Sequence, residues 1–401
     1  MPCPERHVII LGSTGSIGTQ TIDIIERLNQ RGYAFSVVGL AAGKNVERLA
    51  EQIERYHPRA VCIGKETGGE ILRQRFPKVR VFIGEKGLRE LARLDEVDLI
   101  VNALVGAIGL PPTLDGLSLG RTVALANKES LVVGGELVTK FLSEYGGAIL
   151  PIDSEHNAIF QCLRAGRLSE VRRVILTASG GPFLRVHKEE LDRVRPEEAL
   201  CHPNWAMGSR VTIDSATMVN KGFEVIEAHF LFHLPYERIS VIIHPDSVIH
   251  SFVEYHDGSI LAELASPDMR IPIQYALTHP KRVETGLPRL DLEEISRMEF
   301  ETLDHEHFPA FATVLKAAKQ GGTSPAVVNA ADEVLVERFL EGGIPFTGIA
   351  SGLQTILSRW ESDEANLREI SSDAGNQDEV ILSTLLAADR WARKAARYLS
   401  F

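Results

Sequence analysis

Three carboxylates in this sequence have the residue types and surroundings of a metal site. Asp153 and Glu155 stand two residues apart directly after the apolar run AILPI, and Glu224 follows in the segment DSATMVNKGFEVIEA. Hard divalent cations such as Mg²⁺ and Mn²⁺ select carboxylate oxygens. Acid pairs are also common in the first turn of a helix, where they complement the helix dipole. The pair alone leaves both interpretations open, and a third acid favours a metal.

Hydroxyl, amide and ammonium groups elsewhere in the chain have the composition of a phosphate-binding site. Ser215, Asn220 and Lys221 share the segment that contains Glu224, and Ser179 precedes two glycines after the apolar run VILTA. Such donors bind phosphate oxygens. If the segment is helical, Lys221 and Glu224 lie on one face. Each serine could equally cap a helix or a turn.

The segment HPNWAMG has no regular periodicity and contains His202, Trp205, Met207 and Gly208. A loop of this composition could close over a ligand and exclude water. Trp205 could instead be an ordinary anchor of the hydrophobic core. Both interpretations are compatible with the pattern.

The glycine-rich stretch GSTGSIG, Gly12–Gly18, lies between an apolar strand pattern and an amphipathic helix pattern. Glycines let the backbone turn tightly and approach a diphosphate, while the helix N-terminus offers N–H groups and partial positive charge. An isolated glycine trio could be a turn without a ligand. The strand and helix on either side favour a dinucleotide.

The end of the second predicted strand, FSVVGLAA, indicates which dinucleotide binds. NAD sites place an acid there to bond the ribose hydroxyls, but this strand is followed by Gly43, Lys44 and Asn45, and the first acid is Glu47. Lys44 brings positive charge to the position of a 2′-phosphate, which favours NADPH over NADH. Lys44 could also be a solvated lysine at the start of a helix.

Asn127, Lys128 and Glu129 follow the predicted strand TVALA. Ligands of parallel sheets bind at the carboxyl ends of the strands, so these residues are candidates for contact with nicotinamide and substrate. Asn127 also has the residue type of a helix N-cap. Capping does not exclude a role in binding.

The elements that must position these residues form three predicted regions. Residues 1–150 alternate short apolar runs with helical patterns, which predicts βαβ units and a parallel sheet. Residues 151–285 mix helices with alternating strands around an Asp257-Gly258 hairpin signal, which predicts an α+β domain with an antiparallel sheet that could cover a partner subunit. Residues 286–310 resemble a linker, and 311–401 predict a helical bundle.

Bulk composition excludes other classes of protein. A net charge of −11 argues against a nucleic-acid binder, because phosphates would be repelled. The longest apolar stretch, Leu99–Leu110, is interrupted by Asn102 and falls short of the roughly 20 residues of a membrane span. The apolar strand begins too early for a signal or transit peptide, so we expect a cytoplasmic protein. Four widely spaced cysteines predict reduced, mostly buried thiols.

The motifs GSTGSIG, AGKN, NKES, PIDSEHNAIFQ, TASGGPF, HPNWAMG and DSATMVNKGFEVIEA occur in this order. Together with SPDMRIPIQYAL and the C-terminal helices, they resemble the 1-deoxy-D-xylulose 5-phosphate reductoisomerase family of isoprenoid biosynthesis over nearly the whole chain. The resemblance implies an NADPH-dependent oxidoreductase that uses Mg²⁺ or Mn²⁺. Such an enzyme rearranges 1-deoxy-D-xylulose 5-phosphate and reduces the resulting aldehyde to 2-C-methyl-D-erythritol 4-phosphate.

The resemblance also implies an α/β homodimer with an N-terminal Rossmann-like parallel sheet, a central α+β catalytic domain and a C-terminal helical bundle. By motif, it assigns the metal to Asp153, Glu155 and Glu224. It assigns the sugar phosphate to Lys128, Ser154, Ser179, His202, Ser215, Asn220 and Lys221, with Trp205 and Met207 as a lid. It assigns NADPH to Thr14, Gly15, Ser16, Ile17, Gly43, Lys44, Asn45, Asn127, Glu129 and Gly208. The sequence departs from the expected pattern at Asp332, where we expect Asn.

Two alternatives remain at this point. One is another NADPH oxidoreductase of similar layout, such as a semialdehyde or homoserine dehydrogenase, in which hydride transfer needs no metal. The other is a cofactor-sensing protein that binds NADP(H) without turnover. A sensor has no need of the acids and phosphate-type residues beyond the nucleotide-binding region, which disfavours the second alternative.

Overall fold

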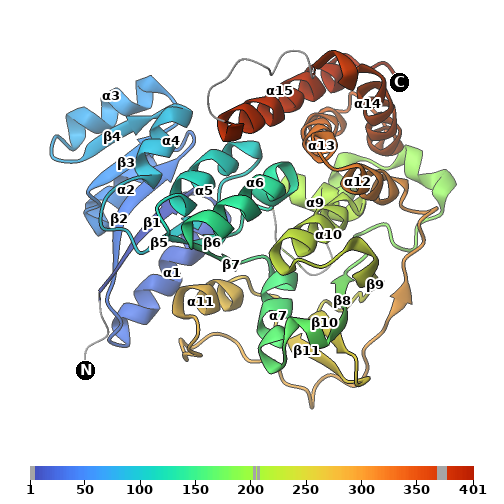
Figure 1. The fold of residues 1–401 in the computed structure, drawn as a ribbon, viewed down its shortest axis with the longest axis horizontal. Helices are drawn as coiled ribbons and strands as arrows, with labels where there is room; N and C mark the ends of the chain where they lie inside the picture. The colour runs from blue at the N-terminus through green and yellow to red at the C-terminus, as the bar shows by residue number, and fades with distance from the viewer. Residues whose placement is uncertain (1–4, 202–204, 206–207, 368–376) are drawn as a thin grey trace. The chain divides into compact units, whose positions relative to one another are not determined.

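The computed structural model describes residues 5–201, 205, 208–367 and 377–401, and its helices and strands are labelled in Figure 1. The chain divides into two compact units. The first comprises Met1–Ser130, Val138–Asn157 and Asp268–Arg289, and the second comprises Leu131–Leu137, Ala158–Pro267 and Leu290–Phe401. The three functional domains expected from the sequence stay a prediction.

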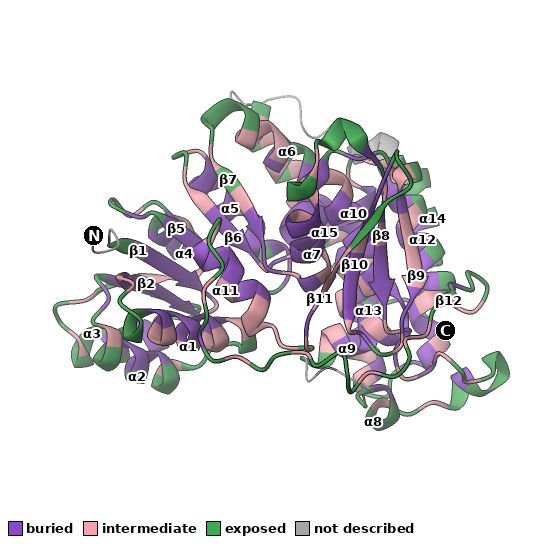
Figure 2. Cartoon of the chain, turned by 90° about the horizontal axis from the view of Figure 1, so that it is seen from below, coloured by how far each residue is buried: buried purple, intermediate pink, exposed green. Residues whose placement is uncertain are grey.

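The first unit contains a seven-stranded parallel sheet with the strand order β4-β3-β2-β1-β5-β6-β7. The strands are β1 (Arg6–Leu11), β2 (Phe35–Ala42), β3 (Ala60–Ile63), β4 (Arg80–Ile83), β5 (Leu99–Asn102), β6 (Thr122–Leu125) and β7 (Ala148–Pro151). The central strands are buried along nearly their whole length (Figure 2), as continuous apolar runs in a parallel sheet require. The predicted parallel sheet is confirmed.

Helices connect these strands in the βαβ pattern that the sequence predicts. They are α1 (Ser16–Gln30), α2 (Val46–Tyr56), α3 (Glu66–Arg75), α4 (Gly84–Ala92), the 3-10 turn Ala107–Gly109 with α5 (Leu110–Leu117), and α6 (Glu129–Tyr145). β1 pairs with both β2 and β5, so the order of the strands reverses at β1. Dinucleotides bind at such reversals, beside the carboxyl ends of the strands.

A later segment, α11 (Arg270–Thr278), also belongs to the first unit. The Arg6 guanidinium donates to the carbonyl oxygen of Leu277 at 3.0 Å. Arg270 pairs with Asp23 of α1 at 3.4 Å. The motif SPDMRIPIQYAL therefore supports the parallel sheet of the first unit, although nothing in its local pattern indicates this.

The second unit contains a five-stranded sheet with the order β11-β10-β8-β9-β12. Its strands are β8 (Val171–Ala178), β9 (Ile239–Ile243), β10 (Ile249–Tyr255), β11 (Ile260–Leu264) and β12 (Glu301–Thr302). The predicted hairpin is confirmed, with Gly258 at φ +89° in the turn between β10 and β11.

The expectation of an antiparallel sheet is wrong for one pair of strands, because β8 and β9 run parallel. The segment between them, residues 179–238, contains α9 (Ser209–Ala216) and α10 (Val219–Phe232). Parallel pairing needs a crossover of a dozen residues or more, and this connection is long enough to supply it. The alternating pattern of each strand indicates which face is buried, but it does not indicate whether the neighbouring strand runs parallel or antiparallel to it.

Helices complete the second unit, and the predicted C-terminal helices are confirmed. They are α12 (Pro309–Gln320), α13 (Ser324–Leu340), α14 (Phe346–Leu367) and α15 (Gln377–Arg397). Shorter elements are α8 (Pro196–Ala199) and the 3-10 turns Leu163–Ala165, Leu168–Glu170, Lys188–Arg193 and Tyr236–Arg238, while α7 (Ser154–Cys162) crosses the boundary between the units. One apolar core joins the four C-terminal helices α12, α13, α14 and α15 to α9 and α10, through side chains such as Phe223, Val314 and Trp360.

Among the described residues, no helix is both long and apolar enough to cross a membrane. Cys62 and Cys162 are buried free thiols, whereas Cys201 is exposed. Cys3 lies outside the described residues. The expected burial of the thiols is thus confirmed for two of the three described cysteines.

Candidate active site

The glycine turn after β1 leaves no room for a side chain at two positions. Gly12 has φ +86°, and a Cβ there would lie 2.4 Å from the carbonyl oxygen of Ala103. At Gly18 a Cβ would lie 2.2 Å from the carbonyl oxygen of Gly12. The turn therefore brings the start of α1 against the strand ends, which is the geometry that a diphosphate-binding turn requires.

The predicted cofactor residues Thr14–Ile17 lie on the outer side of this turn, half-buried or exposed, while Ser13 is buried. Gly15 is the N-cap of α1, and the first turn of that helix contains no acidic residue. The N–H groups at a helix start carry partial positive charge, so the absence of an acid keeps this end favourable for an anion.

The residues after β2 are exposed, as a surface site for a 2′-phosphate requires. Gly43, Lys44 and Asn45 follow the last buried residue of the strand. The side-chain oxygen of Asn45 accepts from the backbone N–H of Arg48 at 3.0 Å and caps α2. Lys44 stands directly before this capping residue.

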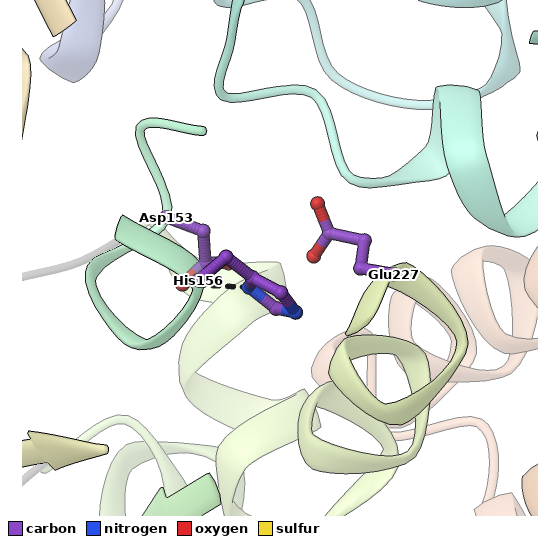
Figure 3. A group of neighbouring side chains, drawn as sticks. All are labelled: Asp153, His156 and Glu227. Atoms are coloured by element: carbon purple, nitrogen blue, oxygen red, sulfur yellow. Dashed lines mark ion pairs between the residues drawn. The ribbon is translucent and has the colours of Figure 1, made fainter. Parts of the chain in front are cut away.

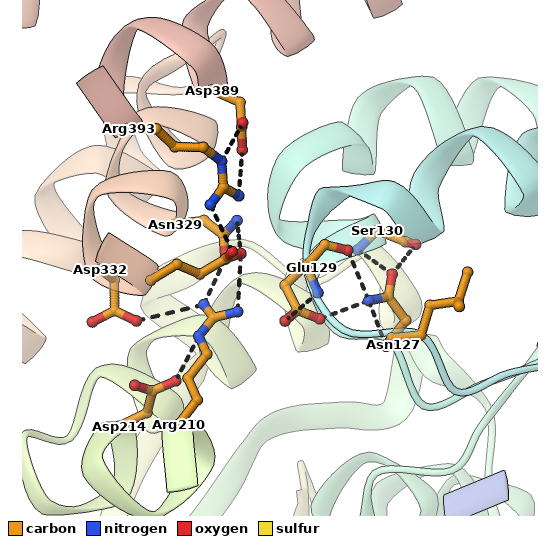
Figure 4. Close-up of polar contacts among 12 residues, drawn as sticks. Asn127, Glu129, Ser130, Arg210, Asp214, Asn329, Asp332, Asp389 and Arg393 are labelled. Carbon is orange, nitrogen blue, oxygen red and sulfur yellow. Dashed lines mark hydrogen bonds and ion pairs between the residues drawn. The ribbon is translucent and has the colours of Figure 1, made fainter. Parts of the chain in front are cut away.

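Asn127 and Glu129, which follow β6, form a buried polar network (Figure 4). The Asn127 amide donates to the carbonyl oxygen of Leu104 at 3.0 Å and to Glu129 Oε2 at 2.7 Å. Glu129 Oε1 accepts from the N–H of Gly106 at 2.9 Å. Asn127 Oδ1 accepts from the N–H of Ser130 at 3.1 Å, so it does accept from the first turn of α6 as predicted, although the N-cap residue of that helix is Lys128. The network fixes the loop after β5 as well as the start of α6.

Lys128 and Asp153 stand at the ends of the neighbouring strands β6 and β7 and form an ion pair at 2.8 Å. Burial acts to raise the pKa of Asp153, but the Lys128 ammonium and His156 outweigh it and hold that pKa well below its usual range. His156 Nδ1 lies 4.0 Å from Asp153 (Figure 3). Asp153 is therefore ionised near neutral pH, as a metal ligand must be.

Two other carboxylates differ in how well the sequence indicated them. Glu155, which was expected to bind metal, accepts from the Ser154 hydroxyl at 2.5 Å. Glu227 is buried on α10 (Figure 3) and was not singled out, although it stands three residues after Glu224 in the same segment. His156 was also missed, although it follows Asp153 by three residues, in the first turn of α7.

In the second unit, the loop after β8 packs against the end of α9. Ser179 Oγ accepts from the N–H of Gly181 at 3.2 Å. Gly181 has φ +67°, and a Cβ there would lie 2.9 Å from the carbonyl oxygen of Ser215. The Ser215 hydroxyl donates to the carbonyl oxygen of Val211 at 2.9 Å. The structure thus brings together two of the segments expected to bind phosphate.

Asn220, Lys221 and Glu224 share one face of α10, as the spacing predicts. The Asn220 amide donates to Glu224 Oε1 at 2.5 Å, and the Lys221 ammonium pairs with Glu224 Oε2. Lys221 and Glu224 are both buried. A buried charge needs a partner of opposite sign, and here a carboxylate and an ammonium satisfy each other beside a second hydrogen-bond donor.

The segment expected to form a lid is described only in part. Trp205 is half-buried, and its ring centroid lies 6.0 Å from that of His250. Gly208 is exposed and is the N-cap of α9. His202 and Met207 lie outside the described residues, so their roles stay predictions.

A cluster of charges that the sequence did not indicate holds α9 to α13 (Figure 4). The Arg210 guanidinium lies 3.0 Å from Glu333, 3.0 Å from the side-chain oxygen of Asn329, 3.4 Å from Asp214 and 3.5 Å from Asp332. These residues are far apart in the sequence, and α9 carries the predicted substrate residue Ser215. The cluster therefore fixes the position of α9, and with it that of Ser215, although Ser215 is not part of the cluster.

Within that cluster, Asp332 is the residue that departs from the expected pattern. Its side chain is fully buried. Burial raises the pKa of Asp332 and the Arg210 charge opposes it, with a net rise to about 6. The carboxylate is thus partly protonated in mildly acidic solution.

Three family models match the chain. Residues 8–135 match 1-deoxy-D-xylulose 5-phosphate reductoisomerase, residues 149–232 match the C-terminal domain of the same family, and residues 264–395 match a further DXP reductoisomerase C-terminal domain. Together the matches cover most of the chain.

Relatives and solved structures carry the same family name. The 1-deoxy-D-xylulose 5-phosphate reductoisomerase of Chlorobium chlorochromatii (strain CaD3) is 47% identical over 394 residues, which cover 98% of this chain and 99% of that protein. The Zymomonas mobilis enzyme in complex with NADPH has TM-score 0.86 and 41% identity, with 98% of both chains covered. A DOX-P reductoisomerase in complex with NADPH, fosmidomycin and magnesium has TM-score 0.89 and 38% identity, with 98% of this chain and 97% of that chain covered.

The raised pKa of Asp332 predicts a pH-dependent effect of Asp332→Asn on stability. Aspartate in an unfolded chain titrates near 3.9, so between about pH 4 and pH 6 the folded state binds the extra proton and stability falls as pH rises. Asparagine does not titrate. The free energy of unfolding of the variant, measured with urea, should therefore rise relative to that of wild type by on the order of 2 kcal/mol between pH 4 and pH 8.

The matched control for this prediction is Glu341→Gln, which neutralises an exposed carboxylate just after the same helix. Its difference from wild type should stay nearly constant over pH 5 to pH 8. A difference between Asp332→Asn and wild type that does not grow with pH would contradict the prediction.

Proposed function

The chain belongs to the 1-deoxy-D-xylulose 5-phosphate reductoisomerase family, and we propose that its own residues serve the reaction of that family in the roles given below. The enzyme catalyses the NADPH- and divalent-metal-dependent rearrangement and reduction of 1-deoxy-D-xylulose 5-phosphate to 2-C-methyl-D-erythritol 4-phosphate. The observation that carries the assignment of roles is the shared carboxyl edge of the parallel sheet. There the glycine turn after β1 and the ionised Asp153 after β7 belong to one compact unit.

The proposed metal ligands are Asp153, Glu155 and Glu224, and Mn²⁺ is proposed as an alternative to Mg²⁺. The donor set consists of carboxylate oxygens, which suits both hard cations. When bound, the metal acts as a Lewis acid on the ketone and its neighbouring hydroxyl, and NADPH supplies the hydride. The low pKa of Asp153 supports this assignment, because no proton competes for its oxygens near neutral pH.

The proposed substrate residues act through hydrogen bonds and charge. The phosphate is bound by Ser179, Ser215, Asn220 and Lys221, whose segments meet at the ends of β8, α9 and α10. Lys128 and Ser154 orient the hydroxyls of the sugar. Phosphate binding away from the reacting carbons supplies free energy for closure of the segment containing His202, Trp205 and Met207, which excludes water.

The proposed cofactor site follows the edge of the first unit. Thr14, Gly15, Ser16 and Ile17 hold the diphosphate at the start of α1, where helix N–H groups favour an anion. Gly43, Lys44 and Asn45 bind the 2′-phosphate. Asn127, Glu129 and Gly208 complete the site, the first two by fixing the loop after β5 as well as by contact with the cofactor.

Assembly and location are also proposals. β11 is an edge strand with a partner on one side, and its residues Ile260 and Leu261 are 52% and 36% exposed. An apolar edge strand favours pairing with another chain, which supports a homodimer. The free thiols of Cys62, Cys162 and Cys201 fit a reducing compartment and support a cytoplasmic location.

Chelation distinguishes this function from that of a dehydrogenase that needs no metal. Treatment with EDTA should abolish NADPH oxidation on addition of 1-deoxy-D-xylulose 5-phosphate, because the rearrangement needs the Lewis acid. Mg²⁺ or Mn²⁺ in excess should restore the loss of NADPH absorbance. Full activity after thorough chelation would reject the metal assignment.

Glu224→Gln should lower kcat by about 100-fold or more, since even changes to the partners of metal ligands cost about 10–100-fold. The amide keeps the shape of the side chain but removes the negative charge. The NADPH dissociation constant, measured by fluorescence without substrate, should stay within about twofold of wild type. The control is Glu237→Gln, an exposed acid of the same unit. Unimpaired turnover in Glu224→Gln would remove this residue from the metal site.

Lys44→Ala should reduce the preference for NADPH over NADH by about tenfold, because a charged hydrogen bond to phosphate contributes about 1.5–3 kcal/mol. The measurement is the ratio of kcat/KM for the two cofactors. Lys78→Ala, an exposed lysine of the same unit, is the matched control. An unchanged ratio in Lys44→Ala would show that another group recognises the 2′-phosphate.

A further inference from the structure

Gln52 is a buried polar residue of α2 that the proposed roles leave unused. Its side chain is 7% exposed and stands among the buried apolar residues Leu49, Ala50 and Ile53 of the same helix. A primary amide has two donor hydrogens and an acceptor oxygen, and burial without partners costs free energy. The partners of Gln52 therefore indicate why this position is polar.

Both ends of the Gln52 amide bind one residue of the glycine turn. Gln52 Nε2 donates to the carbonyl oxygen of Ser13 at 2.9 Å. The Ser13 hydroxyl donates to Gln52 Oε1 at 2.7 Å. Ser13 is fully buried, so both bonds are shielded from water. The amide thus holds the main chain and the side chain of Ser13 at once.

Ser13 is also held to the end of β2. Its N–H donates to the carbonyl oxygen of Ala41 at 2.8 Å, and its hydroxyl lies 3.2 Å from the same oxygen. Ser13 stands between Gly12, which has φ +86°, and Thr14, where the proposed diphosphate contacts begin. Glycine leaves the backbone free to adopt other conformations. The bonds to Gln52 and Ala41 remove that freedom at the point where the turn leaves the strand.

The proposed 2′-phosphate residues stand directly before the N-terminal end of α2. Asn45 caps the helix, and Lys44 precedes it. Gln52 lies about two turns further along the same helix, at a rise of about 1.5 Å per residue. A shift of α2 relative to the turn would therefore move the 2′-phosphate residues relative to the diphosphate residues. The Gln52–Ser13 pair opposes such a shift.

We propose that Gln52 is a positioning residue for NADPH: without touching the cofactor, it fixes the distance between the diphosphate turn and the 2′-phosphate residues. The inference rests on the proposed NADPH site. A role in packing alone would be satisfied by an apolar side chain of similar length, whereas a positioning role requires both bonds to Ser13. The two roles differ in their effect on cofactor binding in a folded enzyme.

The test compares Gln52→Leu, which loses both bonds, with Ser13→Ala, which keeps the bond from Gln52 Nε2 to the carbonyl oxygen. Gln52→Leu should raise the NADPH dissociation constant, measured by fluorescence titration without substrate, by about tenfold. Ser13→Ala should raise it by a smaller factor. The KM for NADPH should follow, and the preference for NADPH over NADH should fall. The kcat at saturating cofactor and the KM for the sugar phosphate should stay within about twofold.

The matched control is Gln74→Leu, the same substitution at an exposed position of α3 in the same unit. The thermal midpoint of each variant shows whether it is folded. The inference is overturned if folded Gln52→Leu binds NADPH as wild type does. It is also overturned if kcat and both KM values worsen together, as a general loss of structure would cause. Failure of the wild-type enzyme to bind NADPH would reject the proposed function itself.

Discussion

The carboxyl ends of parallel strands meet at one edge of a sheet, and the proposed site depends on this constraint. In the first unit, β1, β2, β6 and β7 all end at that edge. The glycine turn, Lys44, the Asn127 network and Asp153 each follow one of these strands. Residues separated by more than a hundred positions thereby share one compact unit. The reversal of strand order at β1 opens the edge for a dinucleotide.

Burial makes the charges of this enzyme dependent on their neighbours, and three carboxylates show three outcomes. Asp153 faces Lys128 and stays ionised because the ammonium outweighs the cost of burial. Glu224 is matched by Lys221 and Asn220 on its own helix. Asp332 shares Arg210 with Glu333 and Asp214, so the attraction available to it is divided and burial dominates its pKa. Asp153 and Asp332 are both shielded from water, yet the pKa of the first is lowered and that of the second is raised.

Polar residues that hold backbone segments in place are as important to the geometry of the proposed site as direct contacts with ligands. Arg210 holds α9, which ends beside the loop after β8. Glu129 and Asn127 hold the loop after β5. Gln52 holds the glycine turn. Buried amides and carboxylates with satisfied partners have few alternative arrangements, so each of these contacts favours one position of the segment that it holds.

Local patterns in the sequence determined much of this protein. The alternation of apolar runs and helices predicted the parallel sheet, Asp257-Gly258 predicted the hairpin, and the spacing of Lys221 and Glu224 predicted their shared face, because each depends on residues close together in the chain. Tertiary structure alone decided the parallel pairing of β8 with β9, the return of α11 to the first unit, and the partners of Arg210 and Gln52. These contacts join segments far apart in the sequence, and side-chain type does not specify which distant group a charge or an amide will meet. The motif order identified the family, while the structure showed which buried polar residues hold the motifs in place.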